Sequence, residues 1–186
     1  MKKTALILGF FLLTLAAGQV RSLSAPAAQP AVVKIQKVEP FAYFCLKHKG
    51  PFSDMQEVIQ RLMLESQTQN VFPSGPLMGI YYSSPEQVKP DQMEWEVGFP
   101  VTPHALVQPP LEYKEWNFTE VAVSTHKGPY EKAGETIAKM MEWMGANGYE
   151  AAGPVMERYM DMDPEETKPQ DLTTEIWIPV KSSRGR

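Results

Sequence analysis

The sequence predicts an α+β domain made by pseudo-twofold duplication of a β-α-β-β unit, with an antiparallel sheet, two helices on one side and a central groove. Three patterns predict this fold class: an internal repeat, a helical stripe of apolar residues in each copy, and strand-like segments around each stripe. The repeat is clearest where His48–Phe52 (HKGPF) recurs as His126–Tyr130 (HKGPY), 78 positions later. Further matches follow in the same order with a single one-residue slip, so we predict two repeats, residues 31–102 and 111–181.

The first repeat begins with two β-rich segments, residues 32–38 and 41–47. A Gly-Pro turn follows, and Ser53 with a glutamine three residues later is typical of a capping box at a helix start. Strands are expected near residues 78–83 and 93–101, on either side of a proline-bracketed loop. The predicted helix carries its apolar residues at helical spacing, at Met55, Val58, Ile59, Leu62 and Met63.

The second repeat follows the same plan after a linker at residues 103–110, where several prolines cannot donate ladder hydrogen bonds. Residues 118–124 are expected to form a strand, and Gly148 lies where a helix C-terminus would need it. Two more strands are predicted near residues 155–160 and 173–180. The intervening helix has an apolar stripe formed by Ile137, Met140, Met141 and Met144.

The N-terminus has the features of a secretory signal, which we place at residues 1–24. Two lysines precede an apolar run, residues 5–17, that is short for a membrane span. Residues 25–30 are rich in Ala and Pro and are expected to form a flexible lead-in. Cleavage would give a periplasmic or secreted protein with no transmembrane segment, and an uncleaved N-terminal anchor is the alternative.

Removal of the signal makes the chain more acidic. Without Lys2, Lys3 and Arg21, the 18 basic residues become 15 against 22 acidic residues, which gives a net charge of −7. An acidic protein repels phosphate backbones, so nucleic-acid binding is disfavoured and a cationic ligand suits the field better than an anionic one. Three scattered histidines and the single Cys45 lack zinc-ligand spacing, so neither a metal nor another cofactor is expected.

Candidate binding residues come from strand alternation. In the strand at 173–180, Ile176 and Ile178 share the face expected to meet the helices, whereas Glu175 and Trp177 share the other face. A carboxylate beside an indole suits a hydrophobic cation, because the carboxylate supplies the opposite charge and the indole an apolar π surface. The alternatives are a solubilising glutamate on an exposed strand face and a tryptophan packed at the junction of the repeats.

Further residues are candidates for the same groove. Glu96 occupies the position of the first repeat that matches the carboxylate of the last strand. Tyr81 and Tyr159 match each other in the third strand of each repeat, where a tyrosine ring either lines a groove or packs half-buried in the sheet. Tyr159 shares its strand face with Glu157. Trp143 lies beside the methionine stripe of the second helix, where packing is more common than a role in a pocket.

A set of residues in the second repeat resembles the GyrI-like family, which includes the effector-binding domains of AraC-type and MerR-type multidrug regulators and the DNA gyrase inhibitor. These residues are HKGPY at 126–130, Trp143, Gly148, Gly153-Pro154, Tyr159, Asp163-Pro164 and TEIWIPV at 174–180. The first repeat is similar through HKGPF at 48–52, Gly75-Pro76, GIYY at 79–82 and Pro100-Val101. The resemblance covers residues 30 to 181, so we predict a single GyrI-like domain at 31–186.

This resemblance implies two β-α-β-β units around a central groove lined by aromatic residues, with a glutamate near the end of the second copy facing the ligand. The matching residue here is Glu175. The regulators of the family bind lipophilic cations in that groove. We expect this chain to differ from the regulators in two ways, since these 186 residues leave no room for a DNA-binding domain beside the GyrI-like one and the chain is expected to leave the cytoplasm.

The residues and the resemblance together favour an exported protein that binds an amphipathic molecule, cationic in the favoured case, between the repeats. Glu175 would supply charge, and Trp177, Tyr159 and Tyr81 would form apolar walls. A hydrolase of strained, cyclopropane-type rings is the alternative, since some stand-alone family members are similar to such enzymes; Glu175 would then act as general base and Tyr159 as an orienting donor. Haem or tetrapyrrole binding is a further alternative, because the SOUL haem-binding proteins resemble this fold, and it requires a histidine of an HKGP segment to face the groove.

Overall fold

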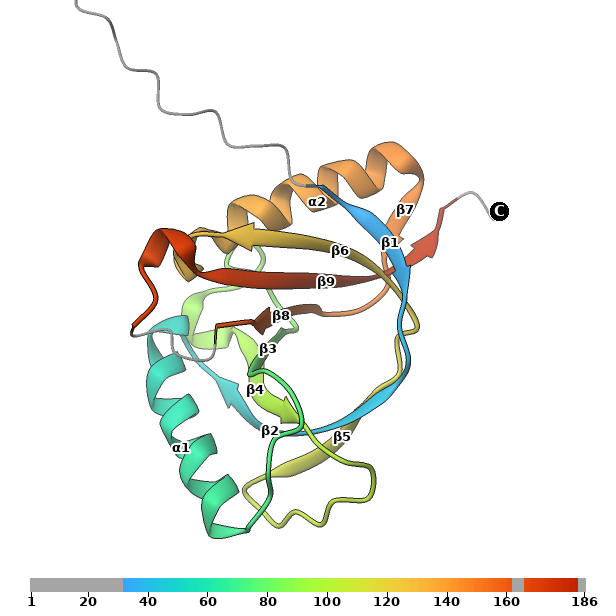
Figure 1. Ribbon diagram of the computed structural model, residues 1–186. Coiled ribbons are helices and arrows are strands. Elements are labelled where there is room, and N and C mark those ends of the chain that lie inside the picture. Colours follow the sequence, from blue (N-terminus) through green and yellow to red (C-terminus); the bar gives the residue numbers. More distant parts are fainter. Residues whose placement is uncertain (1–31, 162–165, 184–186) are drawn as a thin grey trace, which may run out of the picture. The chain divides into compact units, whose positions relative to one another are not determined.

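The computed structural model describes residues 32–161 and 166–183, which form an antiparallel β-sheet with two α-helices (Figure 1). The predicted signal at 1–24 and lead-in at 25–30 lie outside the described residues. Among the described residues, no helix is both long enough and apolar enough to cross a membrane. The strands are β1 (Lys34–Lys37), β2 (Phe41–Lys49), β3 (Met78–Tyr81), β4 (Glu94–Pro100), β5 (Glu112–Trp116), β6 (Glu120–Lys127), β7 (Tyr149–Ala151), β8 (Val155–Tyr159) and β9 (Thr173–Ser182). The helices are α1 (Met55–Thr68) and α2 (Ala133–Asn147), preceded by the 3-10 turns Phe52–Asp54 and Tyr130–Lys132.

The strand order is β1-β6-β9-β8-β3-β4-β2-β5, with β7 paired to β9, and all neighbours are antiparallel. The central strands of the two halves therefore have mirrored order, β6-β9-β8 and β3-β4-β2. This is the predicted α+β class, and the mirrored order supports the predicted duplication, which itself stays a prediction. One feature differs from the simple plan: β1 pairs with β6 and β5 with β2, so the first strand of each half joins the other half.

The sheet curls, because short connections join strands from its opposite ends. β1 ends at Lys37 and β2 begins at Phe41, although six strand positions separate them in the sheet. A flat sheet would place these strands roughly 29 Å apart at the usual spacing, whereas four residues of extended chain reach at most about 14 Å. The connection from β5 to β6 is equally short and has the same effect (Figure 1).

Both helices pack on one face of the sheet, here called the helix face. α1 buries Val58 and Leu62 in a cluster with Trp95 of β4, and α2 buries Met140 in a cluster with Ile176 of β9. The predicted inward face of the strand at 173–180 is therefore confirmed. Burying these side chains removes apolar surface from water at roughly 25 cal/mol per Å², which stabilises helices too short to persist alone.

The face opposite the helices carries an apolar cluster of its own. Because the sheet curls around this face, the cluster forms a second core and not a solvated surface. Burial there raises the pKa of the Cys45 thiol to about 12, so this thiol stays protonated at neutral pH. The buried members of the cluster are Tyr43, Cys45, Met78, Ile80, Trp116, Val121, Val123, Met156 and Trp177.

The predicted helix ends and apolar stripes are confirmed in part. Gly148 adopts a left-handed conformation with φ 78° and ends α2, as predicted. The capping box at Ser53 is wrong: a 3-10 turn precedes α1, and the Ser53 hydroxyl donates to Asp54 Oδ1 at 3.3 Å instead of capping a backbone N–H. Met63 and Met141, placed in the apolar stripes, are 42% and 40% exposed because they lie at the edges of those stripes.

Candidate functional site

The candidate site lies on the helix face, on the two strands at the centre of the sheet. α1 packs mainly on β2 and β4 and α2 mainly on β6 and β7, so β3 and β8 lie between the helices (Figure 1). In the register of β3 and β8, Gly79 lies opposite Glu157. These two residues are separated by the same 78 positions as the repeat matches. The pseudo-twofold axis of the predicted repeats would therefore cross the sheet at this pair.

Two tyrosine hydroxyls meet beside the carboxyl of Glu157. The Oη atoms of Tyr81 and Tyr159 are 2.7 Å apart. Tyr159 Oη donates to Glu157 Oε2 at 3.0 Å, and Tyr81 Oη lies 3.4 Å from the same oxygen. Gly79 leaves the space that the hydroxyls need, because a Cβ there would lie 2.6 Å from Tyr81 Oη and 3.0 Å from Tyr159 Oη. At these matching positions the first half thus has a glycine, Gly79, and the second half has a carboxyl, Glu157.

Aromatic rings from the turns before the helices flank this cluster. The ring of Phe52 meets Tyr81 edge-on with 5.2 Å between centroids, and the ring of Tyr130 meets Tyr159 edge-on at 5.1 Å. Both distances are favourable for edge-to-face pairs. All four rings are half-buried, so part of this aromatic surface is accessible to solvent.

The carboxyl of Glu157 is buried without a cation beside it. Glu157 is 8% exposed, and it takes part in none of the ion pairs among the described residues. Desolvation raises the pKa of Glu157 to about 7, although hydrogen bonds from Tyr159 and Tyr81 oppose the shift. Burial is the largest cause that raises the pKa of Tyr159 well above its ordinary value, and the nearby Tyr81 and Glu157 raise it further. The Tyr159 hydroxyl therefore remains a donor. Near neutral pH the cluster therefore holds a partly ionised carboxyl that is surrounded by aromatic rings and has no counter-ion in the part of the chain that the structure describes.

Glu175 and Trp177 lie on the other face of the sheet, and this corrects the expectation of one shared groove. Arg158 pairs with Glu175 across β8 and β9 and forms an ion pair with it. The Arg158 guanidinium also lies 4.6 Å from the centre of the Trp177 ring. The sheet separates these residues from Tyr81 and Tyr159, which point toward the helices. The charge of Glu175 is therefore already balanced within the fold.

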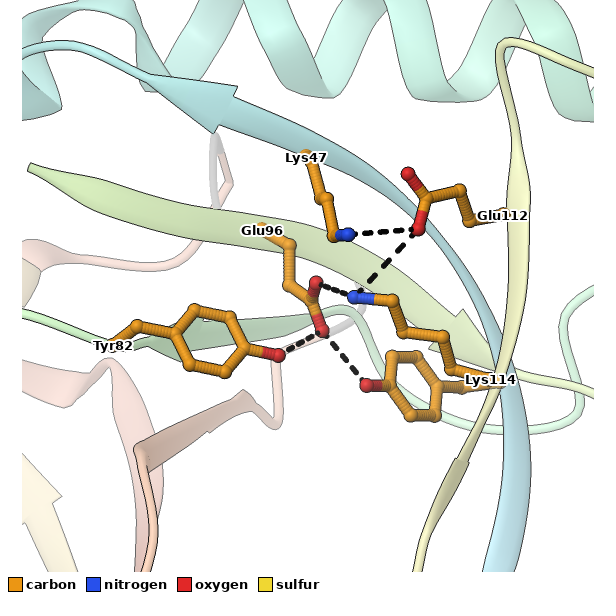
Figure 2. A network of polar contacts seen from close by, with 6 residues as sticks. Lys47, Tyr82, Glu96, Glu112 and Lys114 are labelled. Carbon is orange, nitrogen blue, oxygen red and sulfur yellow. Dashed lines mark hydrogen bonds and ion pairs between the residues drawn. The ribbon is translucent and has the colours of Figure 1, made fainter.

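Glu96 also lies opposite the helices, in a network around its fully buried carboxylate (Figure 2). Its Oε1 accepts hydrogen bonds from Tyr43 at 2.7 Å and from Tyr82 at 2.9 Å. Lys114 forms an ion pair with Oε2 and lies 3.9 Å from Glu112. The structure thus places Glu96 in a satisfied internal network, apart from both Glu157 and Glu175.

The remaining expected residues lie apart from the tyrosine pair. Trp143 stacks on Tyr149 with ring centroids 6.3 Å apart and packs on the apolar cluster beneath α2. Neither HKGP histidine takes part in the cluster: His48 bonds to Asp54 at 2.8 Å, and His126 bonds through Nδ1 to a threonine of α2 at 2.9 Å. The described residues contain no group of three or more His, Cys, Asp or Glu side chains placed to hold a metal.

Sequence reasoning did not select Glu157 as a site residue. The signal that could have found it was present, because alternation places Glu157 on the face of Tyr159, and the repeat matches it with Gly79. Its burial and its lack of a cation depend on strands β3 and β8 meeting, which the sequence pattern did not reveal.

A family model described as the GyrI-like small molecule binding domain matches residues 32–181. The chain is similar to EcmrR in a cryo-EM structure with DNA, at 17% identity and a TM-score of 0.73; the match covers 82% of this chain and 58% of that chain. It is similar to the crystal structure of the EcmrR C-terminal domain, at 18% identity and 0.72, with coverage of 82% and 98%. It is also similar to SAV2435 bound to tetraphenylphosphonium, at 12% identity and 0.54, with coverage of 81% and 94%. These identities show a shared fold alone. No curated protein sequence matches the chain.

Proposed function

The chain belongs to the GyrI-like small-molecule-binding family, and we propose that it binds an amphipathic cation on the helix face, at Glu157. The observation that carries the proposal is the buried Glu157 carboxyl, which two tyrosine hydroxyls contact and which has no counter-ion among the described residues. A cation with apolar substituents would supply the missing charge and would cover the neighbouring rings. SAV2435, which has the same fold, was solved with a cation of this kind.

We infer that ligand entry displaces the rings of Phe52 and Tyr130 from Tyr81 and Tyr159. Both rings meet the two tyrosines edge-on. Neither of the hollows of about 490 and 560 Å³ in the described part of the chain is lined by Glu157 or by these rings. Both rings belong to three-residue 3-10 turns, so a local shift of a turn would open the site while α1 and α2 stay packed.

Glu175 supports the same function less well. A cation binding at Glu175 would have to displace Arg158, whereas the described residues hold no cation that it would have to displace at Glu157. The hydrolase alternative assigned the general base to Glu175, and no contact of the described residues favours that role. Haem binding would need His48 or His126 to leave its present partner.

We test the proposal by isothermal titration of the full chain with tetraphenylphosphonium chloride at pH 8. Glu157→Gln removes the charge and keeps the shape, so we expect the dissociation constant to rise at least about tenfold, equivalent to about 1.4 kcal/mol. Glu175→Gln is the matched control and should change it by less than about twofold. A wild-type chain that does not bind the cation, or a larger loss in Glu175→Gln than in Glu157→Gln, would contradict the proposal.

We further propose that the protein acts outside the cytoplasm, because residues 1–24 have the pattern of a secretory signal. Expression of the full chain in a Gram-negative host, followed by fractionation and mass spectrometry, tests this. A mature N-terminus near Gln19 or Ala25 in the periplasm or medium would support export. An intact N-terminus in the cytoplasm would contradict it.

A further inference from the structure

A hollow of about 490 Å³ lies where the chain crosses from β5 to β6, with Lys114 and Trp116 facing it from the side opposite the helices. The sheet separates it from Glu157, so it is not part of the site proposed above. Its size falls within the usual range for small-molecule sites, and such sites are mostly aromatic and apolar. The hollow has this character, since its walls include Tyr43, Tyr82, Trp116, Phe118 and Pro154.

The charged groups beside the hollow are balanced among themselves. Glu96 receives hydrogen bonds from the hydroxyls of Tyr43 and Tyr82 and an ion pair from Lys114 (Figure 2). Lys114 and Lys47 also lie on either side of Glu112, whose Oε2 is 3.2 Å from Lys47 Nζ. Glu115 adds one exposed carboxylate at the rim, where solvent screens it. The network therefore offers neither an unpaired cation nor an unpaired anion to a ligand.

One buried polar group of the wall, the indole N–H of Trp116, is a hydrogen-bond donor without an acceptor among the described residues. Trp116 is 2% exposed, and its indole N–H has no acceptor among the described residues. Buried donors in folded proteins nearly always have a partner, so an orphaned one calls for an explanation. The hydroxyls of Tyr43 and Tyr82 already donate to Glu96. This N–H is closed to solvent in the present conformation, so an acceptor delivered by a ligand would satisfy it once the Trp116 ring turns toward the hollow.

We propose that this hollow is a second binding site, for an uncharged aromatic molecule that carries an acceptor oxygen such as a ketone or amide carbonyl. The aromatic part would pack on the rings of Tyr82, Trp116 and Phe118. The carbonyl oxygen would accept from the Trp116 indole N–H. The buried charges beside the hollow are paired and Glu115 is exposed to solvent, so the hollow favours a neutral ligand, in contrast to the cation expected on the helix face.

The experiment uses the full chain and prodan, an uncharged naphthalene with a ketone oxygen whose emission moves to shorter wavelength in an apolar setting. We expect saturable binding of one prodan with a blue shift. Trp116→Phe removes the donor, so its dissociation constant should rise at least about fivefold, as loss of one hydrogen bond predicts. Trp177→Phe is the matched control, because Trp177 also has a buried unpaired indole N–H but does not line the hollow.

A second measurement does not depend on the variants being stable. In the wild-type chain labelled with ¹⁵N, prodan should shift the indole N–H signal of Trp116 and leave that of Trp177 in place. Saturating tetraphenylphosphonium should not displace prodan, since the two sites lie on opposite faces. Absence of prodan binding, equal losses in the two variants, an unmoved Trp116 signal, or displacement by the cation would each overturn the second site.

Discussion

Replacing Glu157 by Gln should change how stability depends on pH. The side chain is 8% exposed, and burial raises the pKa of its carboxyl from 4.5 to about 7. Between these two values the native state holds a proton that the unfolded state has lost. The contribution of Glu157 to the free energy of unfolding therefore falls as pH rises from about 4.5 to 7, and it is lost above 7.

The size of the effect follows from the shift. Each pKa unit corresponds to about 1.4 kcal/mol, so the full shift corresponds to about 3 kcal/mol. Glutamine does not titrate, so the variant lacks this loss. We expect Glu157→Gln to gain about 3 kcal/mol relative to the wild type between pH 4.5 and pH 8.

Urea unfolding followed by tryptophan fluorescence, at half-unit steps from pH 4.5 to 8.5, measures this difference. Other titrating groups contribute to both proteins and cancel in the subtraction. Glu175→Gln serves as control, because that carboxylate is ion-paired with Arg158 and should not produce the same rising difference. If the curves of Glu157→Gln and wild type run parallel across the range, the carboxyl is not desolvated as the structure indicates.

Three further predictions concern the tyrosine cluster at Glu157 and the polar network around Glu96. Gly79→Ala places a methyl group against the tyrosine hydroxyls and should lower stability by about 1–3 kcal/mol; an unchanged thermal midpoint would contradict the packing. The affinity for tetraphenylphosphonium should weaken about tenfold per unit as pH falls below 7 and level off above 8, because only ionised Glu157 attracts the cation; a flat titration profile would refute this. Lys114→Met strands the buried charge of Glu96 and should cost about 3–5 kcal/mol in urea unfolding, whereas Lys181→Met, from an exposed pair, should cost less than about 1 kcal/mol; similar losses would mean that burial of the first pair is unimportant.

Much of the fold follows from local patterns. The stripes around Leu62 and Met140 predicted helices, and alternation in the last strands predicted which residues meet them, because both patterns depend only on backbone periodicity. The pairing of β1 with β6 and of β5 with β2 was not predicted, since nothing in a strand's own sequence names a partner from the other half.

In the candidate site, too, local patterns predicted the faces of single strands but not how the strands pair. Sequence alternation correctly put Tyr159 and Glu157 on one strand face and Glu175 on the opposite face of its own strand. It did not relate these faces across strands, so Tyr81, Tyr159 and Glu175 were expected in one groove although the sheet divides them. Their grouping on one face or the other required the register of the strands.

The sequence by itself determined the class of the domain, the faces of its strands and helices, and the matching positions 79 and 157 of its predicted repeats. Only the tertiary structure decided which carboxyl has no ion-pair partner among the described residues, because Arg158 reaches Glu175 and Lys114 reaches Glu96 through strand pairings distant in the chain. Desolvation and charge balance are sums over spatial neighbours, and a linear sequence does not list those neighbours.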